Sequence, residues 1–216
     1  MTYLAELLTR TDAPQIIAEA QKYLNNEQLL RKQFYENLTP SVKAEFIGGE
    51  VVLHSPVKKN HNTANGLLFS LLNTYVNIND LGFVGMEKIL IQCSRNDYEP
   101  DICYFANAKA DSFTEEQMLF PPPDFVVEII SKSTERTDRK TKFEDYALHG
   151  IAEYWIIAPK KQTVEQYQLV GKKYELVKIY QEAEMIECLV LPELKFRVNA
   201  IFDKKQHIIA LKRLFL

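Results

Sequence analysis

Two acidic side chains occupy positions where a buried β-strand would favour apolar residues. Asp101 opens the apolar segment DICYF, and Glu128 lies in the middle of DFVVEIIS, residues 124–131. A carboxylate inside a buried strand is costly unless a positive group pairs with it. For Glu128 alone, a buried salt bridge to a Lys or Arg explains the pattern as well as a metal does. Two carboxylates on neighbouring strands could instead converge at one end of a sheet and bind a hard cation such as Mg²⁺.

A basic segment follows Glu128 and is the densest positive region of the chain. Between positions 132 and 142 the basic residues outnumber the acidic Glu135 and Asp138; they are Lys132, Arg136, Arg139, Lys140 and Lys142. Taken alone, such a segment is typical of a solvated helix face with pairs between residues i and i+4. Beside a pair of metal-binding carboxylates, it could instead hold the phosphates of a nucleic acid.

The overall composition predicts one well-filled globular domain with an additional element. The chain has 216 residues, 46% of them hydrophobic and 11% aromatic, with 7 Gly and 9 Pro, which excludes a disordered or low-complexity protein. A net charge of −3 is unlike that of most nucleic-acid-binding proteins, so any anionic ligand requires a local basic surface. The sequence has no P-loop, G-x-G-x-x-G or C-x-x-C motif, so nucleotide cofactors and structural zinc have no support.

The cysteines and the N-terminal residues indicate the cellular compartment in which we expect the protein. Cys93, Cys103 and Cys188 lie far apart within apolar segments, which predicts buried reduced thiols rather than disulfides. The first residues lack the basic start and apolar core of a signal peptide, and no segment approaches the roughly 18 apolar residues that span a bilayer. We therefore expect a cytoplasmic protein without a membrane partner.

Residues 1–40 are predicted to form a helical extension separate from the main domain. Apolar residues recur at three-to-four spacing in residues 13–24 and 27–38, and Thr39-Pro40 ends the second segment. The two segments could form a helical hairpin. This hairpin either lies on the main domain or serves in dimerisation, and the sequence does not choose between them.

From residue 41 onward the pattern is that of an α/β domain. The segment EFIGGEVVLHS has Gly48-Gly49 at the turn of a predicted hairpin, and Asn60 is the expected N-cap of a helix over residues 61–77. The later expected elements are strands at 87–93, 101–105, 124–131 and 153–158, a helix at 135–149, and a second hairpin at 163–180. This order predicts a central mixed β-sheet with helices on both faces.

One long segment, PPPDFVVEIISKSTERTDRKTKFEDYALHGIAEYWIIAPKKQTVEQYQL, strongly resembles the Uma2 family (DUF820) of the PD-(D/E)XK nuclease superfamily. The resemblance runs from AEFIGGEVVLHSP through Pro100-Asp101 to PELKFRVNAIF, which is most of residues 41–202. It implies a restriction-endonuclease-like domain over residues 41–216, with a central mixed β-sheet flanked by helices, after the N-terminal helical extension of residues 1–40.

The resemblance also implies roles at the site. Asp101 matches the PD aspartate and Glu128 the second acidic residue, which together bind the divalent metal, Mg²⁺ or Mn²⁺. Ile130 departs from the superfamily pattern, which has a Lys two residues after the Glu to polarise the attacking water. Lys142 is the natural substitute, because its long side chain could reach back from the following helix to the carboxylates. The alternative for Lys142 is a surface lysine paired with Asp138.

Further matching residues would complete the site or contact the substrate. Glu45 resembles the upstream acidic residue of many superfamily sites, although a surface Glu beside a turn would give the same pattern. His61 matches a family histidine and could contact a phosphate or a water, or bond to the backbone at the start of its helix. The flanking phosphates would be held by Lys132, Arg136, Arg139 and Lys140.

These observations lead us to expect a metal-dependent, endonuclease-like phosphodiester hydrolase acting on nucleic acid, which we take to be DNA, as a homodimer. One alternative is a catalytically inactive nuclease-fold protein that binds DNA or another partner, because a decaying site would also lack the in-strand Lys. A second is purely structural: Glu128 and Lys142 form a buried ion pair, and no metal binds.

Overall fold

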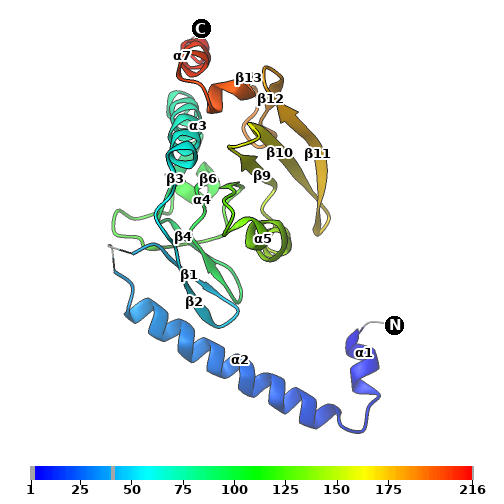
Figure 1. Ribbon diagram of the computed structural model, residues 1–216. Helices are drawn as coiled ribbons and strands as arrows, with labels where there is room; N and C mark the ends of the chain where they lie inside the picture. The colour runs from blue at the N-terminus through cyan, green and yellow to red at the C-terminus, as the bar shows by residue number, and fades with distance from the viewer. Residues whose placement is uncertain (1–2, 40–41, 216) are drawn as a thin grey trace.

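A six-stranded mixed sheet forms the centre of the computed structural model, which describes residues 3–39 and 42–215 (Figure 1). Its order is β11-β10-β9-β8-β6-β3, and only β8 and β9 run parallel among these neighbours. The strands are β3 (Gly82–Met86), β6 (Ile102–Ala106), β8 (Phe125–Ile129), β9 (Glu153–Ala158), β10 (Thr163–Val170) and β11 (Lys173–Gln181). The strands expected at 101–105, 124–131 and 153–158 and the hairpin at 163–180 are therefore confirmed.

A second sheet of five short strands lies beside the first. Its order is β2-β1-β5-β4-β7, and its strands are β1 (Ala44–Ile47), β2 (Glu50–Leu53), β4 (Leu90–Gln92), β5 (Asp97–Tyr98) and β7 (Leu119–Phe120). The β1–β2 hairpin turns at Gly48-Gly49 as the sequence predicts. The expected strands at 87–93 and 101–105 fall in different sheets, because the chain between them folds back as β5 onto β4. A two-stranded ribbon, β12 (Met185–Glu187) with β13 (Lys195–Arg197), completes the strands of the described chain.

Helices cover both faces of the central sheet, as predicted. One face packs against α3 (Lys59–Ile78) and α7 (Lys204–Arg213), and its core includes Val127 and Trp155. The other face packs against α6 (Phe143–Leu148), and its core includes Val126 and Tyr154. Successive residues of β8 and β9 thus point to opposite faces and are buried on both, which explains why these strands are almost continuously apolar.

Beyond the N-terminal extension, the described chain has four further short helical elements. They are α4 (Asn107–Ala110), α5 (Glu135–Thr137), the π-helix η1 (Asp138–Lys142) and the 3-10 helix η2 (Val198–Ile201). The N-cap of α3 is Lys58 rather than the expected Asn60, and Lys58 makes no side-chain capping bond.

No helix in the described ranges is long and apolar enough to cross a membrane. Cys93, Cys103 and Cys188 are free and buried, as their sequence context predicts.

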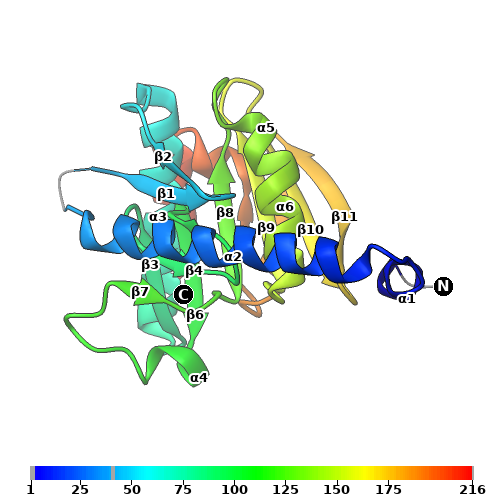
Figure 2. The same cartoon turned by 90° about the horizontal axis from the view of Figure 1, so that it is seen from below.

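The N-terminal extension contains one long helix rather than the expected hairpin. After α1 (Tyr3–Leu8), the helix α2 (Ala13–Glu36) continues through Asn25 and Asn26, which have modest helix propensity but do not break a helix as Pro does (Figures 1 and 2). Arg31 of α2 donates to Asp97 at 2.7 Å, and Glu27 accepts from Arg95 at 2.6 Å. The second half of α2 is therefore fixed to the five-stranded sheet, whereas α1 has no buried residue.

A buried carboxylate far from the predicted site holds the C-terminal part of the domain. Glu153 Oε1 accepts from Trp155 at 2.6 Å and from Gln166 at 2.7 Å. Its Oε2 accepts from the Cys188 thiol at 3.2 Å and from the backbone N–H groups of Leu189 and Val190 at 2.8 and 3.0 Å. Because these donors satisfy both oxygens, the carboxylate acts as a cross-link between β9 and the loop after β12.

We expect Glu153→Ala to lower the free energy of unfolding by about 3–5 kcal/mol, because several buried donors would lose their acceptor at once. Urea denaturation measures the change, and Glu175→Ala, at an exposed position of β11, is the matched control. A loss of less than about 1 kcal/mol would show that water replaces the carboxylate at little cost.

Candidate nuclease site

Asp101 and Glu128 meet at one end of the central sheet. The register of the antiparallel pair β6–β8 sets Ile102 opposite Val127, which places Asp101, the residue before β6, opposite Glu128. Residues directly opposite in an antiparallel pair project from the same face. The backbone N–H of Ile129 donates to Asp101 Oδ2 at 2.8 Å, so the strand that carries Glu128 also fixes Asp101. The sheet thus brings together the two carboxylates that the sequence predicts to converge.

Lys142 lies within a set of three buried carboxylates. Its Nζ is 2.8 Å from Glu45 Oε1, 2.9 Å from Glu128 Oε1 and 3.6 Å from Asp138 Oδ1, and the Lys142 side chain is 3% exposed. Tyr146 also donates to Glu128 Oε1, at 2.8 Å. Lys142 is therefore not the surface lysine of the alternative reading, and it reaches back to Glu128 as expected.

The helix that carries Lys142 departs from regular α geometry at that point. The expected single helix at 135–149 is divided into α5, the π-helix η1 and α6, and η1 contains Asp138 and Lys142. A π-turn takes an additional residue and is rare outside functional sites. Here it places Asp138 and Lys142 on the buried side of the segment, facing the sheet.

The acidic side chains of the site differ in how strongly their surroundings stabilise the ionised form. Burial alone would raise the pKa of Asp101, but the hydrogen bond from His61 and the charge of Lys43 lower it to about 2. Burial likewise opposes ionisation of Glu45, and the charges of Lys142 and His54 lower its pKa to about 2. Burial raises the pKa of Glu128 to about 8 despite Lys142, because Asp138 and other acids lie nearby. The surroundings of Asp101 and Glu45 thus favour their ionised forms, whereas Glu128 is the acid whose ionisation a bound cation would favour most.

Two residues that sequence reasoning missed lie on the other side of Asp101. Lys43, the residue before β1, has its Nζ 3.4 Å from Asp101 Oδ1 and 3.2 Å from Glu87 Oε2. Glu87 Oε1 in turn accepts from the side-chain amide of Asn65 at 2.9 Å. A signal for Lys43 was available, since it precedes Glu45 by two positions and residues at that spacing in a strand share a face. Glu87 gave no such signal.

His61 lies beside Asp101 rather than on the backbone. Its Nε2 is 3.2 Å from Asp101 Oδ2, and its Nδ1 is buried without a hydrogen-bond partner among the described residues. Burial alone would lower the pKa of His61, but the hydrogen bond and charge of Asp101 raise it. The alternative of a helix-start histidine bonded to the backbone is therefore wrong, because His61 contacts Asp101 instead. A contact of His61 with a phosphate or a water stays a prediction.

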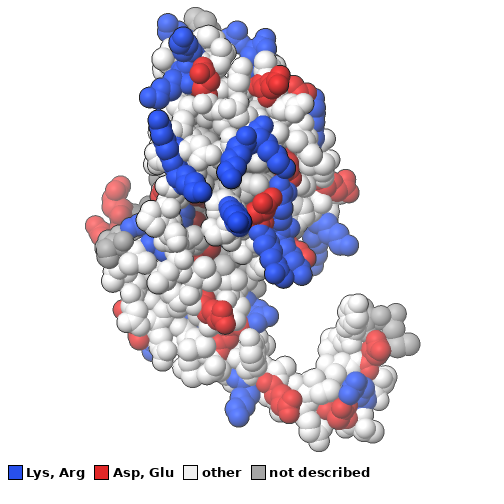
Figure 3. Space-filling view, viewed as in Figure 1, with Lys and Arg blue, Asp and Glu red and all other residues white. Residues whose placement is uncertain are grey.

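The basic segment after β8 separates into free and paired charges. Lys132, Arg136 and Lys140 are exposed, and none of them forms an ion pair with another residue in the described ranges. Arg139 instead contacts Glu135 at 3.0 Å and Glu165 at 2.6 Å, which occupies its guanidinium. Figure 3 shows Lys and Arg side chains gathered on the face around α5. A positive surface thus follows directly on the strand that carries Glu128.

The donor set at Asp101 and Glu128 fits a hard divalent cation. Both residues offer carboxylate oxygens, the ligands that Mg²⁺ and Mn²⁺ prefer. Glu128 Oε2 has no hydrogen bond to a described residue, and Asp101 Oδ1 faces only Lys43, at 3.4 Å. Within residues 3–39 and 42–215, Asp101 and Glu128 belong to no group of three His, Cys, Asp or Glu whose donor atoms all lie within 4.8 Å of one another. Water and a phosphate oxygen would therefore complete the coordination of a bound ion.

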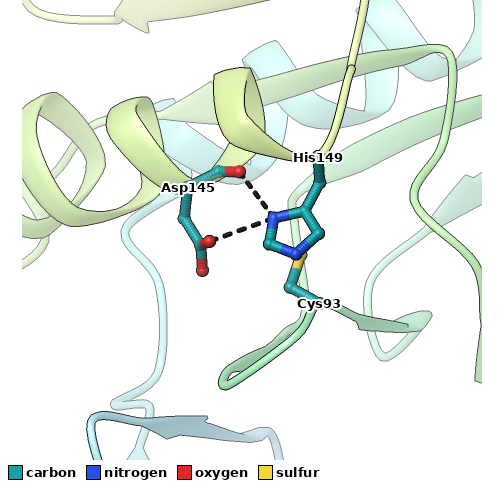
Figure 4. A group of neighbouring side chains, drawn as sticks. All are labelled: Cys93, Asp145 and His149. Atoms are coloured by element: carbon teal, nitrogen blue, oxygen red, sulfur yellow. Dashed lines mark hydrogen bonds and ion pairs between the residues drawn. The ribbon is translucent and has the colours of Figure 1, made fainter. Parts of the chain in front are cut away.

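A different group of three donors, Cys93, Asp145 and His149, does have its ligand atoms within 4.8 Å of one another (Figure 4). His149 Nδ1 lies 3.0 Å from Asp145 Oδ1, and His149 Nε2 accepts from the backbone N–H of Ser94 at 2.8 Å. Burial raises the pKa of the Cys93 thiol well above its usual value. Because both imidazole nitrogens are already bonded and the thiol stays protonated, this group ties the end of α6 to the turn after β4 and offers no ready metal site.

The central mixed sheet has helices on both faces and two buried acidic residues at one end, so the structure defines an α/β domain with a candidate metal site. The sequence model of the Uma2 family, described as a putative restriction endonuclease, matches residues 27–199, and the chain belongs to this family. The match begins within α2, whose second half packs on the domain.

Comparison with solved structures supports the same fold. The chain is similar to the crystal structure of a putative nuclease belonging to DUF820 from Anabaena variabilis, with a TM-score of 0.69 and 19% sequence identity. The similarity covers 79% of this chain and 96% of the other. No curated protein matches the sequence.

Proposed function

We propose that this protein is a metal-dependent endonuclease that hydrolyses phosphodiester bonds in nucleic acid, with DNA as the substrate. The observation that carries the proposal is the pairing of Asp101 with Glu128 across β6 and β8, with one lysine beside each carboxylate. Membership of a family described as a putative restriction endonuclease supports it. Buried acids at a sheet end are costly to the fold, and a catalytic role gives a reason for them.

In the proposed mechanism, two carboxylates bind the metal ion and neighbouring residues hold these carboxylates in position. Asp101 and Glu128 would hold Mg²⁺ or Mn²⁺, which when bound neutralises phosphate charge and lowers the pKa of a coordinated water. Lys142, itself paired with Glu45, fixes Glu128 Oε1, and His61 with the Ile129 N–H fixes Asp101 Oδ2. In the reaction, the attacking water gives a proton to solvent as its oxygen bonds to phosphorus, the P–O bond of the leaving alcohol breaks, and the leaving oxygen takes a proton from solvent.

The three free cations Lys132, Arg136 and Lys140 are proposed to hold phosphates beside the scissile bond. Replacing all three with Ala should weaken metal-free duplex binding and reduce the slope of log K against log salt by about 2–3, since each phosphate contact contributes about 0.9. Fluorescence anisotropy of a labelled duplex in EDTA measures this slope. The control replaces Lys172, Lys173 and Lys212, which are exposed outside this segment. An equal loss in the control would assign the effect to net charge alone.

The N-terminal extension supports a homodimeric state. Apolar side chains of α1 and of the first half of α2 are exposed, among them Leu4, Leu8, Ile17 and Tyr23. A second copy of the chain would cover them. Sedimentation equilibrium of the full chain should give twice the monomer mass, and a monomer at micromolar concentration would contradict this assignment. The buried free thiols agree with a cytoplasmic location.

The test of the function is cleavage by the purified protein. Supercoiled plasmid and single-stranded DNA are incubated with Mg²⁺, with Mn²⁺ and with EDTA, and we expect cutting in the first two conditions only. A protein that retards DNA in a gel but never cuts it would be a nuclease-fold binding protein. Absence of metal uptake by calorimetry, together with a more stable Glu128→Gln variant, would instead leave Glu128 and Lys142 as a structural ion pair.

A further inference from the structure

The site contains two lysines, and their surroundings differ. Lys142 approaches Glu128 from the helical layer, and Lys43 approaches Asp101 from the segment before β1. The superfamily pattern expects one lysine, to act on the attacking water, and the sequence offered Lys142 for it. The contacts of the two side chains decide which of them is available to a substrate.

Lys142 has little capacity left for a ligand. Its ammonium group has three hydrogens, and carboxylate oxygens of Glu45 and Glu128 lie 2.8 and 2.9 Å from it. Asp138 Oδ1 lies at 3.6 Å, beyond hydrogen-bond distance, and adds a third negative charge. The ring of Tyr98 lies on a further side, with its centroid 5.6 Å from Nζ. With the Lys142 side chain 3% exposed, a phosphate could reach the ammonium only if a buried ion pair opened. Lys142 is thus placed to hold the acids in position.

Lys43 lies at the edge of the site with weaker contacts. Its side chain is 16% exposed, and its ammonium meets two carboxylates at the longer distances of 3.2 and 3.4 Å. One of these partners, Glu87, is itself 36% exposed. The ammonium of Lys43 therefore keeps donor capacity on a side that solvent and substrate can reach.

The oxygen of Asp101 that Lys43 contacts is the one left for a ligand. Oδ2 accepts from the Ile129 N–H at 2.8 Å and lies 3.2 Å from His61 Nε2, whereas Oδ1 has Lys43 at 3.4 Å. A group that binds Oδ1 must approach on the side where Lys43 lies. A phosphate that approached the site on this side would meet the positively charged ammonium group of Lys43.

The turn that holds Lys43 in place has a costly backbone. Glu87 and Lys88 have φ values of +52° and +44°, in the left-handed region that side chains other than glycine rarely adopt. Glu87 is fixed by Lys43 and by Asn65, and its backbone N–H donates to the carbonyl of Asp101 at 3.3 Å. Backbone strain of this kind concentrates at functional sites, where the surrounding contacts enforce it.

From these contacts we propose that Lys43 is the catalytic lysine, donating to a non-bridging oxygen of the scissile phosphate, and that Lys142 and Glu87 are positioning residues. The ammonium stays protonated throughout and stabilises the charge that develops on the phosphate as the P–O bond breaks. This assignment rests on the proposed phosphodiesterase function and names the residue that acts on the phosphate.

The test compares Lys43→Met, Lys43→Arg and Lys142→Met with Lys212→Met, an exposed lysine of α7, as the matched control. Single-turnover cleavage of a labelled oligonucleotide is measured with saturating Mg²⁺, Mn²⁺ affinity is measured by calorimetry, and the melting temperature is recorded without metal. For Lys43→Met we expect a rate at least about 100-fold lower. Mn²⁺ should bind this variant at least as tightly as the wild type, because a cation beside Asp101 has been removed. The melting temperature should fall less than it does in Lys142→Met, because Lys43 is more exposed than Lys142 and its ion pairs are longer. Lys43→Arg should recover part of the rate, and Lys142→Met should melt several degrees lower.

Three other results would contradict the catalytic role of Lys43, and they can be told apart. If the wild type cuts and Lys43→Met cuts equally fast, Lys43 does not contact the phosphate, although the proposed function stands. If Lys43→Met loses Mn²⁺ binding together with activity and melts as low as Lys142→Met, its role is structural. If the wild type neither cuts nor binds metal, the proposed function fails and the role of Lys43 fails with it.

Discussion

Asp101→Asn should reduce metal-dependent DNA cleavage by at least about 10³-fold while leaving the fold intact. The amide has the same shape as the carboxylate and can still accept from the Ile129 N–H, so β6 and β8 keep their register. It lacks the charge that a divalent cation requires and that places Lys43 and His61 around Asp101. The variant should therefore fail in chemistry and metal binding rather than in folding.

Single-turnover cleavage and Mn²⁺ calorimetry measure the two effects of Asp101→Asn, and circular dichroism checks the fold. Asp111→Asn, at an exposed position after α4, is the control and should behave as the wild type. An Asp101→Asn protein that cuts DNA within about tenfold of the wild type would remove Asp101 from the site.

Lys142→Met should be the most destabilising substitution at the site, with a loss of about 3–5 kcal/mol in the free energy of unfolding. Its removal leaves Glu45, Glu128 and Asp138 buried together without the cation that separates them. Methionine fills much of the same volume, so the loss reports on charge rather than on a cavity. Urea denaturation at neutral pH measures it, and Lys178→Met, which breaks an exposed pair with Glu184, should leave the free energy of unfolding nearly unchanged.

The pH dependence of the Lys142→Met deficit provides a second test. A carboxylate left without its cation has a higher pKa in the folded state than in the unfolded chain, so it binds a proton more readily when folded. Stability of the variant should therefore fall as pH rises, and its deficit relative to the wild type should shrink as pH is lowered towards 5. A deficit that does not change with pH would mean that lost packing, rather than unpaired charge, destabilises the variant.

The parts of the fold that could be predicted from the sequence are those with strong local patterns. The hairpin at Gly48-Gly49 and the doubly buried strand β8 follow from turn residues and a continuous apolar run. Glu128 stood out because a charge interrupts that run, and Asp101 because it opens the neighbouring strand. In both cases the feature lies within a few consecutive residues.

The strand β3 could not be predicted, because its glycines suggest a turn. A side chain at Gly82 would place Cβ 2.1 Å from the carbonyl oxygen of Phe105, and one at Gly85 would place it 2.7 Å from Ile89. Gly82 is required by the close approach of β6, which lies in a distant part of the sequence, and Gly85 leaves room both for Ile89 and for Cys103 of β6. The same limit applies to Glu87, whose partners Lys43 and Asn65 come from other elements.

The role of Lys142 shows how tertiary context changes an interpretation. The sequence predicts that Lys142 reaches back from its helix to the carboxylates, with a helix-surface lysine paired with Asp138, four residues earlier, as the alternative. The contact with Asp138 does exist, at 3.6 Å. The π-helix turns both residues inward, so that the same lysine also meets Glu45 and Glu128 from two other elements. No local pattern signals a π-turn, and the three-carboxylate environment followed only from the assembled sheet.

A crystal of the protein grown with Mn²⁺ and measured at a wavelength where manganese scatters anomalously tests the central claim most directly. We predict one anomalous peak between Asp101 and Glu128, within about 2.0–2.3 Å of an oxygen of each, with Lys142 still bonded to Glu45. The absence of manganese at this position, with Lys142 and Tyr146 remaining the partners of Glu128, would contradict it.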